Sequence, residues 1–129
     1  MSHREVVNAP GAPPAAGPYS HAVKSNGMLF CSGQVPLDPA TGKLVEGSIG
    51  DQTRRCMDNL ATVAAAAGAD LSDAVRMGIF VTDISVFGEV NEAYGAYFPA
   101  DPPARSTIGV AALPLGARVE IEAVIALRD

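Results

Sequence analysis

The feature that most constrains this fold is an alternation of apolar and charged residues near the end of the chain. From residue 118 to 127 every second residue is apolar, and Arg118, Glu120 and Glu122 occupy positions between them. Side chains alternate between the two faces of a β-strand. The run therefore predicts a strand with one buried and one charged face. Such charges are also typical of a solvated surface, so spacing alone leaves a chemical role open.

A second strand-like run, Arg105–Val110, precedes this one across a turn at Pro114–Gly116. Its alternation places Arg105, Thr107 and Gly109 on one face. We predict that the two strands are neighbours in the sheet. A cation would then lie close to carboxylates and beside a small hydroxyl residue, which is suitable for binding a small acid.

The first part of the chain predicts strands around an irregular arm. Residues 4–7 are typical of a short edge strand, and Asn8–Pro18 is rich in Pro, Ala and Gly, which favours an extended arm. Strands are expected at about His21–Lys24 and Met28–Ser32. The sequence Ser25-Asn26-Gly27 between them predicts a hairpin turn.

A long helix follows. Ser48, with Asp51 three residues later, resembles a capping box, and Gly68 provides the stop. Apolar residues at helical spacing form one face that we expect to pack on the sheet. These residues are Ile49, Cys56, Met57, Leu60, Val63, Ala64 and Ala67.

The rest of the chain predicts a strand at Val75–Val81 and a second helix that begins at Asp83 or Ser85 and ends at Pro99. The order is thus hairpin, helix, strand, helix and two strands. It indicates one α+β domain over residues 1–129, a mixed sheet with both helices on one face. The expected buried face of the second helix comprises Phe87, Val90, Tyr94, Tyr97 and Phe98.

Composition narrows the function. With 48% hydrophobic and 18% charged residues, the chain has more apolar surface than a small monomer hides, which favours a partner subunit. The net charge of -5 argues against nucleic-acid binding. Cys31 and Cys56 lack metal-site spacing and are expected to be reduced core residues. His3 and His21 have no suitably spaced partner, and we expect neither to be a catalyst.

No apolar run approaches the roughly 18 residues of a membrane span, and the first residues lack the basic-then-apolar pattern of a signal peptide. We therefore expect a cytoplasmic protein without membrane contact.

Short motifs distributed over nearly the whole chain resemble, in their order, those of the Rid family, the reactive-intermediate imine deaminases. They are Gly17-Pro18-Tyr19-Ser20, Ser32-Gly33-Gln34, Asp38-Pro39-Ala40-Thr41-Gly42, Asn59-Leu60, Pro103-Ala104-Arg105-Ser106-Thr107 and Val119-Glu120-Ile121-Glu122-Ala123.

The resemblance implies a chorismate-mutase-like α+β fold that forms a homotrimer with active sites between subunits. It also implies hydrolysis of 2-imino acids, such as 2-iminopropanoate and 2-iminobutanoate, to 2-keto acids and ammonia. These imino acids arise from enamines released by PLP-dependent dehydratases. No metal or organic cofactor is implied.

The resemblance assigns roles to particular residues. Arg105 matches the arginine that holds the substrate carboxylate, for which a guanidinium fork is well suited; its structural alternative is an ion pair with Glu120 or Glu122. Glu120 matches the glutamate that positions the attacking water, and Glu122 ranks second. Tyr19 matches a tyrosine that closes the pocket, or else it is a core residue that anchors the arm.

Further substrate contacts are implied at the family's S-G-Q turn. There, Ser32 and Gly33 bring backbone groups close to the ligand. Thr107 occupies a position where some relatives have Cys, so a thiol nucleophile is excluded there, but its backbone N–H remains a candidate carboxylate donor. Gly109 replaces a larger polar residue of some relatives, which leaves the size of the pocket open.

Two other classes of function remain open. A binding-only or chaperone-like relative needs Arg105 but not Glu120. An endoribonuclease is disfavoured by the acidic composition.

Overall fold

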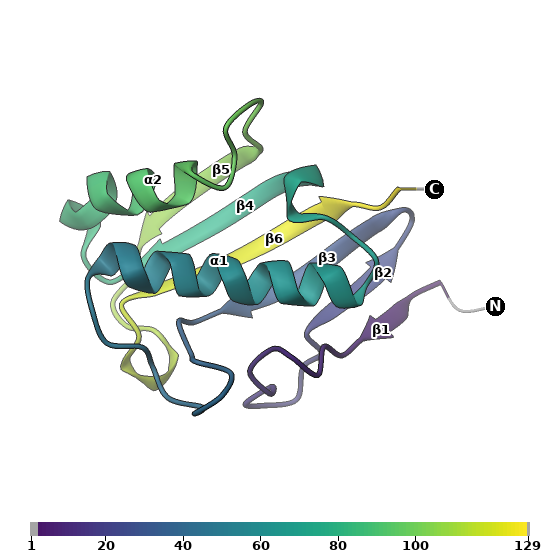
Figure 1. Ribbon diagram of the computed structural model, residues 1–129, viewed down its shortest axis with the longest axis horizontal. Helices are drawn as coiled ribbons and strands as arrows, with labels where there is room; N and C mark the ends of the chain where they lie inside the picture. The colour runs from purple at the N-terminus through teal and green to yellow at the C-terminus, as the bar shows by residue number, and fades with distance from the viewer. Residues whose placement is uncertain (1–2, 129) are drawn as a thin grey trace.

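The computed structural model describes residues 3–128, which form a six-stranded sheet with two helices on one of its faces (Figure 1). Along the sheet the strand order is β1-β2-β3-β6-β4-β5. The strands are β1 (Glu5–Val7), β2 (Ala22–Ser25), β3 (Met28–Gln34), β4 (Ala74–Val81), β5 (Ala104–Gly109) and β6 (Val119–Ala126).

The predicted mixed α+β sheet with both helices on one face is confirmed. Helix α1 (Ile49–Ala66) and helix α2 (Phe87–Gly95) lie side by side across it (Figure 1). Strands β4 and β5 are parallel and joined through α2, whereas the other pairs are antiparallel.

The predicted pairing of the last two strands is wrong, because β4 lies between β5 and β6. The crossover through α2 places β5 beside β4 as a parallel edge strand. Strand β6 pairs with the other edge of β4 and continues the sheet toward β3. Arg105 and the carboxylates of β6 are consequently not on neighbouring strands.

The predicted hairpin joins β2 and β3. Asn26 and Gly27 have φ angles of 51° and 74°, the left-handed values that a tight two-residue hairpin turn needs. Strand β3 does not stop at Ser32 but continues to Gln34, with a register shift between Cys31 and Gln34. Such a bulge re-aims side chains within a strand.

Helix α1 begins as predicted. Ser48 Oγ accepts a hydrogen bond from the Asp51 N–H at 3.1 Å, and Asp51 Oδ2 accepts one from the Ser48 N–H at 3.2 Å. Gly68, with φ of 73°, follows the helix. The predicted apolar face is buried throughout, and Cys31 and Cys56 are free, buried thiols.

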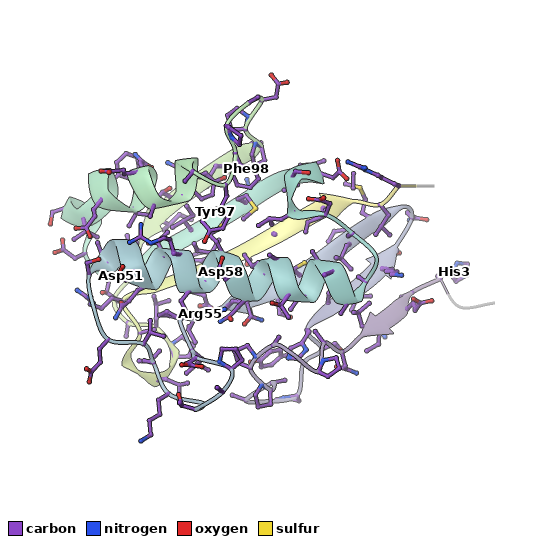
Figure 2. The ribbon with its side chains drawn as sticks, in the orientation of Figure 1. His3, Asp51, Arg55, Asp58, Tyr97 and Phe98 are labelled. Carbon is purple, nitrogen blue, oxygen red and sulfur yellow. The ribbon has the colours of Figure 1, made fainter. Side chains whose placement is uncertain are left out.

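Helix α2 is shorter than predicted, ending at Gly95 rather than at Pro99. Asp83 caps a preceding 3-10 turn, Ile84–Val86, and not the helix itself. Beyond the helix, Tyr97 donates a hydrogen bond of 2.7 Å to Asp58 on α1, and Figure 2 shows this side chain beside that helix. The predicted buried face is right for Val90, Tyr94 and Phe98, and wrong for Phe87, which is exposed.

The two faces of the sheet differ strongly. On the helix side, the predicted apolar face of β6 is buried from Val119 to Ile125. Strand pairing places Val6, Phe30 and Ile108 on the opposite face, together with Glu120. Phe30 and Ile108 are 49% and 48% exposed. In the described chain the second face thus carries exposed apolar side chains together with the charged side chains of Glu120, Glu122 and Arg76.

Candidate active site

A pocket of about 400 Å³ opens on the face of the sheet opposite the helices. It gathers side chains from the N-terminal arm, from the bulge of β3, from the Pro114 turn and from β6. Four of the predicted site residues therefore come together within one chain. The lining residues are Ala16, Tyr19, Ser32, Gly33, Pro114 and Glu120.

Glu120 lies directly over Gly33, which faces it from the neighbouring strand. A Cβ on Gly33 would lie 2.9 Å from Cδ of Glu120 and would collide with Oε2. The bulge in β3 falls at this point, between Cys31 and Gln34. Glycine is therefore needed here so that the carboxylate can lie against the strand.

The environment of Glu120 raises the pKa of its carboxyl group, mainly through partial burial and further through the negative charge of Glu122. A carboxylate with a raised pKa is a stronger base, suited to exchange protons with water. Glu122 itself is exposed. It lies instead against Gly78, where a Cβ would be 2.9 Å from its Cγ, and it does not line the pocket.

Tyr19 forms the arm side of the pocket. Its side chain is 48% exposed, so the alternative of a core tyrosine is wrong, although it does contact the arm. The hydroxyl oxygen accepts a hydrogen bond from the Ala16 N–H at 3.1 Å. Because that bond uses a lone pair and not the proton, the Tyr19 O–H remains able to donate to a ligand.

Ser32 ties the bulge of β3 to the end of the arm. Its Oγ donates to the carbonyl of Ser20 at 2.6 Å, and its N–H donates to the carbonyl of His21 at 3.0 Å. Both donors of Ser32 are therefore occupied by the chain itself. What the residue offers a ligand is the remaining acceptor capacity of its hydroxyl oxygen.

Arg105 lies on the other face of the sheet. It pairs with buried Met77, which in turn pairs with Ala123 on the buried face of β6. Glu120 pairs with Phe80 and faces the opposite way. Within one chain the structure therefore does not bring Arg105 to the pocket of Glu120. The alternative ion pair of Arg105 with a β6 carboxylate is wrong for the same reason.

Side chains of α2 hold the Arg105 guanidinium in place. Its Nη2 donates a hydrogen bond of 2.7 Å to Oδ1 of Asn91. Its Cζ lies 4.9 Å from the ring centre of Tyr94 and 5.6 Å from that of Phe87, distances typical of cation–π contacts. One acceptor and two rings thus fix the fork while several N–H donors remain for a ligand.

Thr107 shares the face of Arg105, since it pairs with buried Ile79. Its Oγ1 is buried without a hydrogen-bond partner among the described residues. Unpaired buried hydroxyls are uncommon, because burial without a partner costs free energy. This second group of predicted residues is thus partly unsatisfied in the isolated chain.

Sequence reasoning missed three contributors. Ala16 and Pro114 line the pocket, and neither residue type carries a chemical signal. Asn91 was detectable, because Phe87, Asn91 and Tyr94 have the spacing i, i+4 and i+7 of one helical face.

Two kinds of feature are absent from residues 3–128. No helix there is long and apolar enough to cross a membrane. Within the same residues, no group of three or more His, Cys, Asp or Glu side chains is arranged to hold a metal ion.

The fold and the pocket define an α+β protein that presents a carboxylate in a small cavity on an open sheet face. Residues 9–127 match the family described as Endoribonuclease L-PSP. The chain belongs to this family, the YjgF/Rid family, which confirms the resemblance found in the sequence.

Named relatives are similar over most of the chain. Reactive Intermediate Deaminase A, chloroplastic, from Arabidopsis thaliana is 48% identical over 96% of this chain and 66% of its own length. The 2-iminobutanoate/2-iminopropanoate deaminase of Mus musculus is 44% identical over 94% of this chain and 90% of its own. The crystal structure of E. coli TdcF with bound serine has a TM-score of 0.89 and 36% identity, covering 97% and 99% of the two chains.

Proposed function

We propose that this chain hydrolyses 2-imino acids, such as 2-iminopropanoate and 2-iminobutanoate, to 2-keto acids and ammonia. The observation that carries the proposal is the half-buried Glu120, with its raised pKa, in a pocket that Tyr19 also lines. Membership of the Rid family and the names of its similar relatives support the substrate class.

In this mechanism Glu120 directs a water molecule to the carbon of the C=N bond. The carboxylate takes a proton from the water as the new C–O bond forms, and it delivers that proton to nitrogen. Collapse of the resulting carbinolamine breaks the C–N bond, so one imino acid and one water give one keto acid and one ammonia. The free O–H of Tyr19 orients the substrate by donating a hydrogen bond.

Arg105 binds the substrate carboxylate through its guanidinium fork. Because this side chain and Glu120 lie on opposite faces of one sheet, we propose that Arg105 of one subunit completes the pocket of its neighbour. Asn91, Tyr94 and Phe87 support this role by holding the fork in place before the substrate arrives. Thr107 lies two residues further along β5, and its backbone N–H is the candidate second donor to the substrate carboxylate.

We propose a homotrimer for the assembly, with the open face of the sheet as the subunit contact. Its exposed apolar side chains, Phe30 and Ile108 among them, support this assignment, since an apolar face of this kind is typical of a subunit interface.

The two free, buried cysteines support a reducing compartment, and we place the protein in the cytoplasm.

The proposal is tested by coupling the purified protein to a threonine dehydratase supplied with threonine. We expect faster release of 2-keto acid than in the uncatalysed reaction. Arg105→Ala should abolish the acceleration by removing the carboxylate fork. Glu120→Gln should keep acid binding but lose turnover, because the amide fills the same space and does not take a proton.

A wild-type rate equal to the uncatalysed one would contradict the proposal and leave the binding-only alternative. Because the family is described as Endoribonuclease L-PSP, RNA is the second substrate that should be tested. Cleavage of RNA that survives repurification and is lost in Glu120→Gln would replace deamination as the function of this pocket.

A further inference from the structure

We propose that His21 is a positioning residue, which fixes the N-terminal arm so that Tyr19 and Ala16 form one wall of the pocket. The arm comprises residues 8–20, between β1 and β2. This inference rests on the proposed function for its catalytic consequence, but its structural part is testable without any assay of activity.

His21 lies just before β2 and is buried, with 6% of its surface exposed. Both ring nitrogens contact backbone groups of the arm. Nδ1 accepts a hydrogen bond from the Ala9 N–H at 2.9 Å, and Nε2 lies 2.8 Å from the carbonyl oxygen of Pro13. Because a carbonyl only accepts and an amide N–H only donates, the proton belongs on Nε2. The ring therefore bridges two points of the arm in one defined tautomer.

The arm has few other means of holding its shape. It contains no helix or strand, and its prolines at positions 10, 13, 14 and 18 have no N–H to donate. Figure 1 shows it as a purple segment that loops between β1 and β2. Ala9 and Ala12 are buried, and the Ala12 N–H donates to the carbonyl of Ala9 at 3.1 Å. The His21 ring adds the contact between this short turn and the sheet.

The bond from Nε2 to the Pro13 carbonyl closes the base of a loop, residues 14–20. This loop carries both arm residues of the pocket, Ala16 and Tyr19. Inside it, the Ala16 N–H donates to the Tyr19 hydroxyl at 3.1 Å, so the position of one residue determines that of the other. The backbone carbonyl of His21 also accepts from Ser32 on the opposite wall. His21 therefore contacts both walls of the pocket, and the bond from the Ser32 hydroxyl to the Ser20 carbonyl joins them a second time.

Two variants of His21 distinguish the effect of the ring's hydrogen bonds from the effect of the space that the ring fills. His21→Phe keeps an aromatic ring but removes both bonds, whereas His21→Gln retains one acceptor and one donor. The chain has three tyrosines, so protein labelled with 3-fluorotyrosine gives few fluorine signals, and Tyr19→Phe assigns the relevant one. We expect the Tyr19 signal to narrow and shift toward the value of unfolded protein in His21→Phe. It should stay close to wild type in His21→Gln, while the signals of Tyr94 and Tyr97 stay unchanged in both.

Kinetics then test whether the arm acts through Tyr19. We expect His21→Phe to lower kcat/KM about tenfold in the otherwise wild-type protein, since misplaced positioning groups cost rate. In a Tyr19→Ala background the same substitution should cost less than about twofold, because coupled residues are non-additive. Equal losses in both backgrounds would overturn the proposed route through Tyr19.

The wild-type protein provides a test that needs no variant. Long-range proton–nitrogen NMR of the His21 ring should show a protonated Nε2 and an unprotonated Nδ1. A protonated Nδ1, or an unchanged Tyr19 signal in His21→Phe, would overturn the positioning role. Failure of the proposed function is distinguishable, since imino acids would then not be hydrolysed even though the tyrosine signal responds to His21→Phe.

Discussion

One face of this sheet is buried under the helices and the other is open, and the predicted catalytic groups are divided between them. On the helix side, Arg105 is held by a hydrogen bond and two aromatic rings. On the open side, Glu120 lies half-buried over Gly33, on a face that also carries the exposed side chains of Phe30 and Ile108. The helix-side face is packed into the buried core, while the open face is exposed in the isolated chain.

This division indicates how a small protein can combine a guanidinium and a carboxylate that one chain keeps apart. Side chains on opposite faces of a strand point away from each other, so one small acid does not reach both within a single chain. In the assembly that we propose, a neighbouring copy covers the open face and supplies a second wall. This explains why the same face carries both the pocket and the unpartnered apolar surface.

The largest expected effect follows from placing a charge on the open face. Phe30→Glu puts a carboxylate into the proposed subunit contact, where burial without a partner is costly. We expect dissociation to monomers and loss of about 100-fold or more in activity. Light scattering and the coupled dehydratase assay measure the two consequences.

Ala65→Glu is the matched control, because Ala65 is exposed on helix α1. It should leave assembly and activity unchanged. A Phe30→Glu protein that remains a trimer with wild-type activity would show that the open face is not the subunit contact.

A smaller effect is expected from Gly33→Ala, which places a methyl group 2.9 Å from Cδ of Glu120. The carboxylate must then move, and we expect about a tenfold fall in kcat with the fold retained, since positioning errors of this size are costly. Steady-state kinetics and thermal unfolding measure the two properties.

Gly88→Ala is the control for this change, because no atom beyond the adjacent residues and the helix's own backbone lies within 4 Å of the added Cβ on helix α2. Alanine there should be neutral or slightly stabilising. Wild-type kcat in Gly33→Ala would show that the position of Glu120 is not critical.

The smallest effect concerns stability. The pKa of Glu120 is raised in the folded chain, so its ionised form is disfavoured by folding at neutral pH. Glu120→Gln removes this cost and should raise Tm by about 1–3 °C near pH 7. The gain should shrink as pH falls through the raised pKa and vanish below the pKa of the unfolded chain. Thermal scans at fixed protein concentration measure it, and a gain that grows toward acidic pH would contradict the assignment.

Local signals in the sequence predicted most of the elements. Asn26-Gly27 marks its hairpin and Ser48 with Asp51 marks the start of α1, because turn and cap chemistry act over a few residues. Alternation correctly divided the last two strands, β5 and β6, into two faces. The end of helix α2 was predicted too far along the chain, because Tyr97 and Phe98 continue its apolar spacing although the helix ends at Gly95.

The sequence did not predict how the strands are ordered. Alternation relates residues within one strand, whereas the relation of Arg105 to Glu120 depends on register across β4. That register is set by a non-local parallel crossover through α2. The four residues Tyr19, Ser32, Gly33 and Glu120, which were selected through the family's motifs, line one pocket, while the separation of Arg105 and Thr107 from them appears only in the structure.

The most direct test of the shared site is complementation between two inactive variants. Arg105→Ala and Glu120→Gln subunits are unfolded, mixed in equal amounts and refolded together. If each site takes Arg105 from one subunit and Glu120 from its neighbour, random assembly restores about one quarter of the wild-type activity. Each variant refolded alone should stay inactive. A mixture that is no more active than its components would contradict a site shared between subunits.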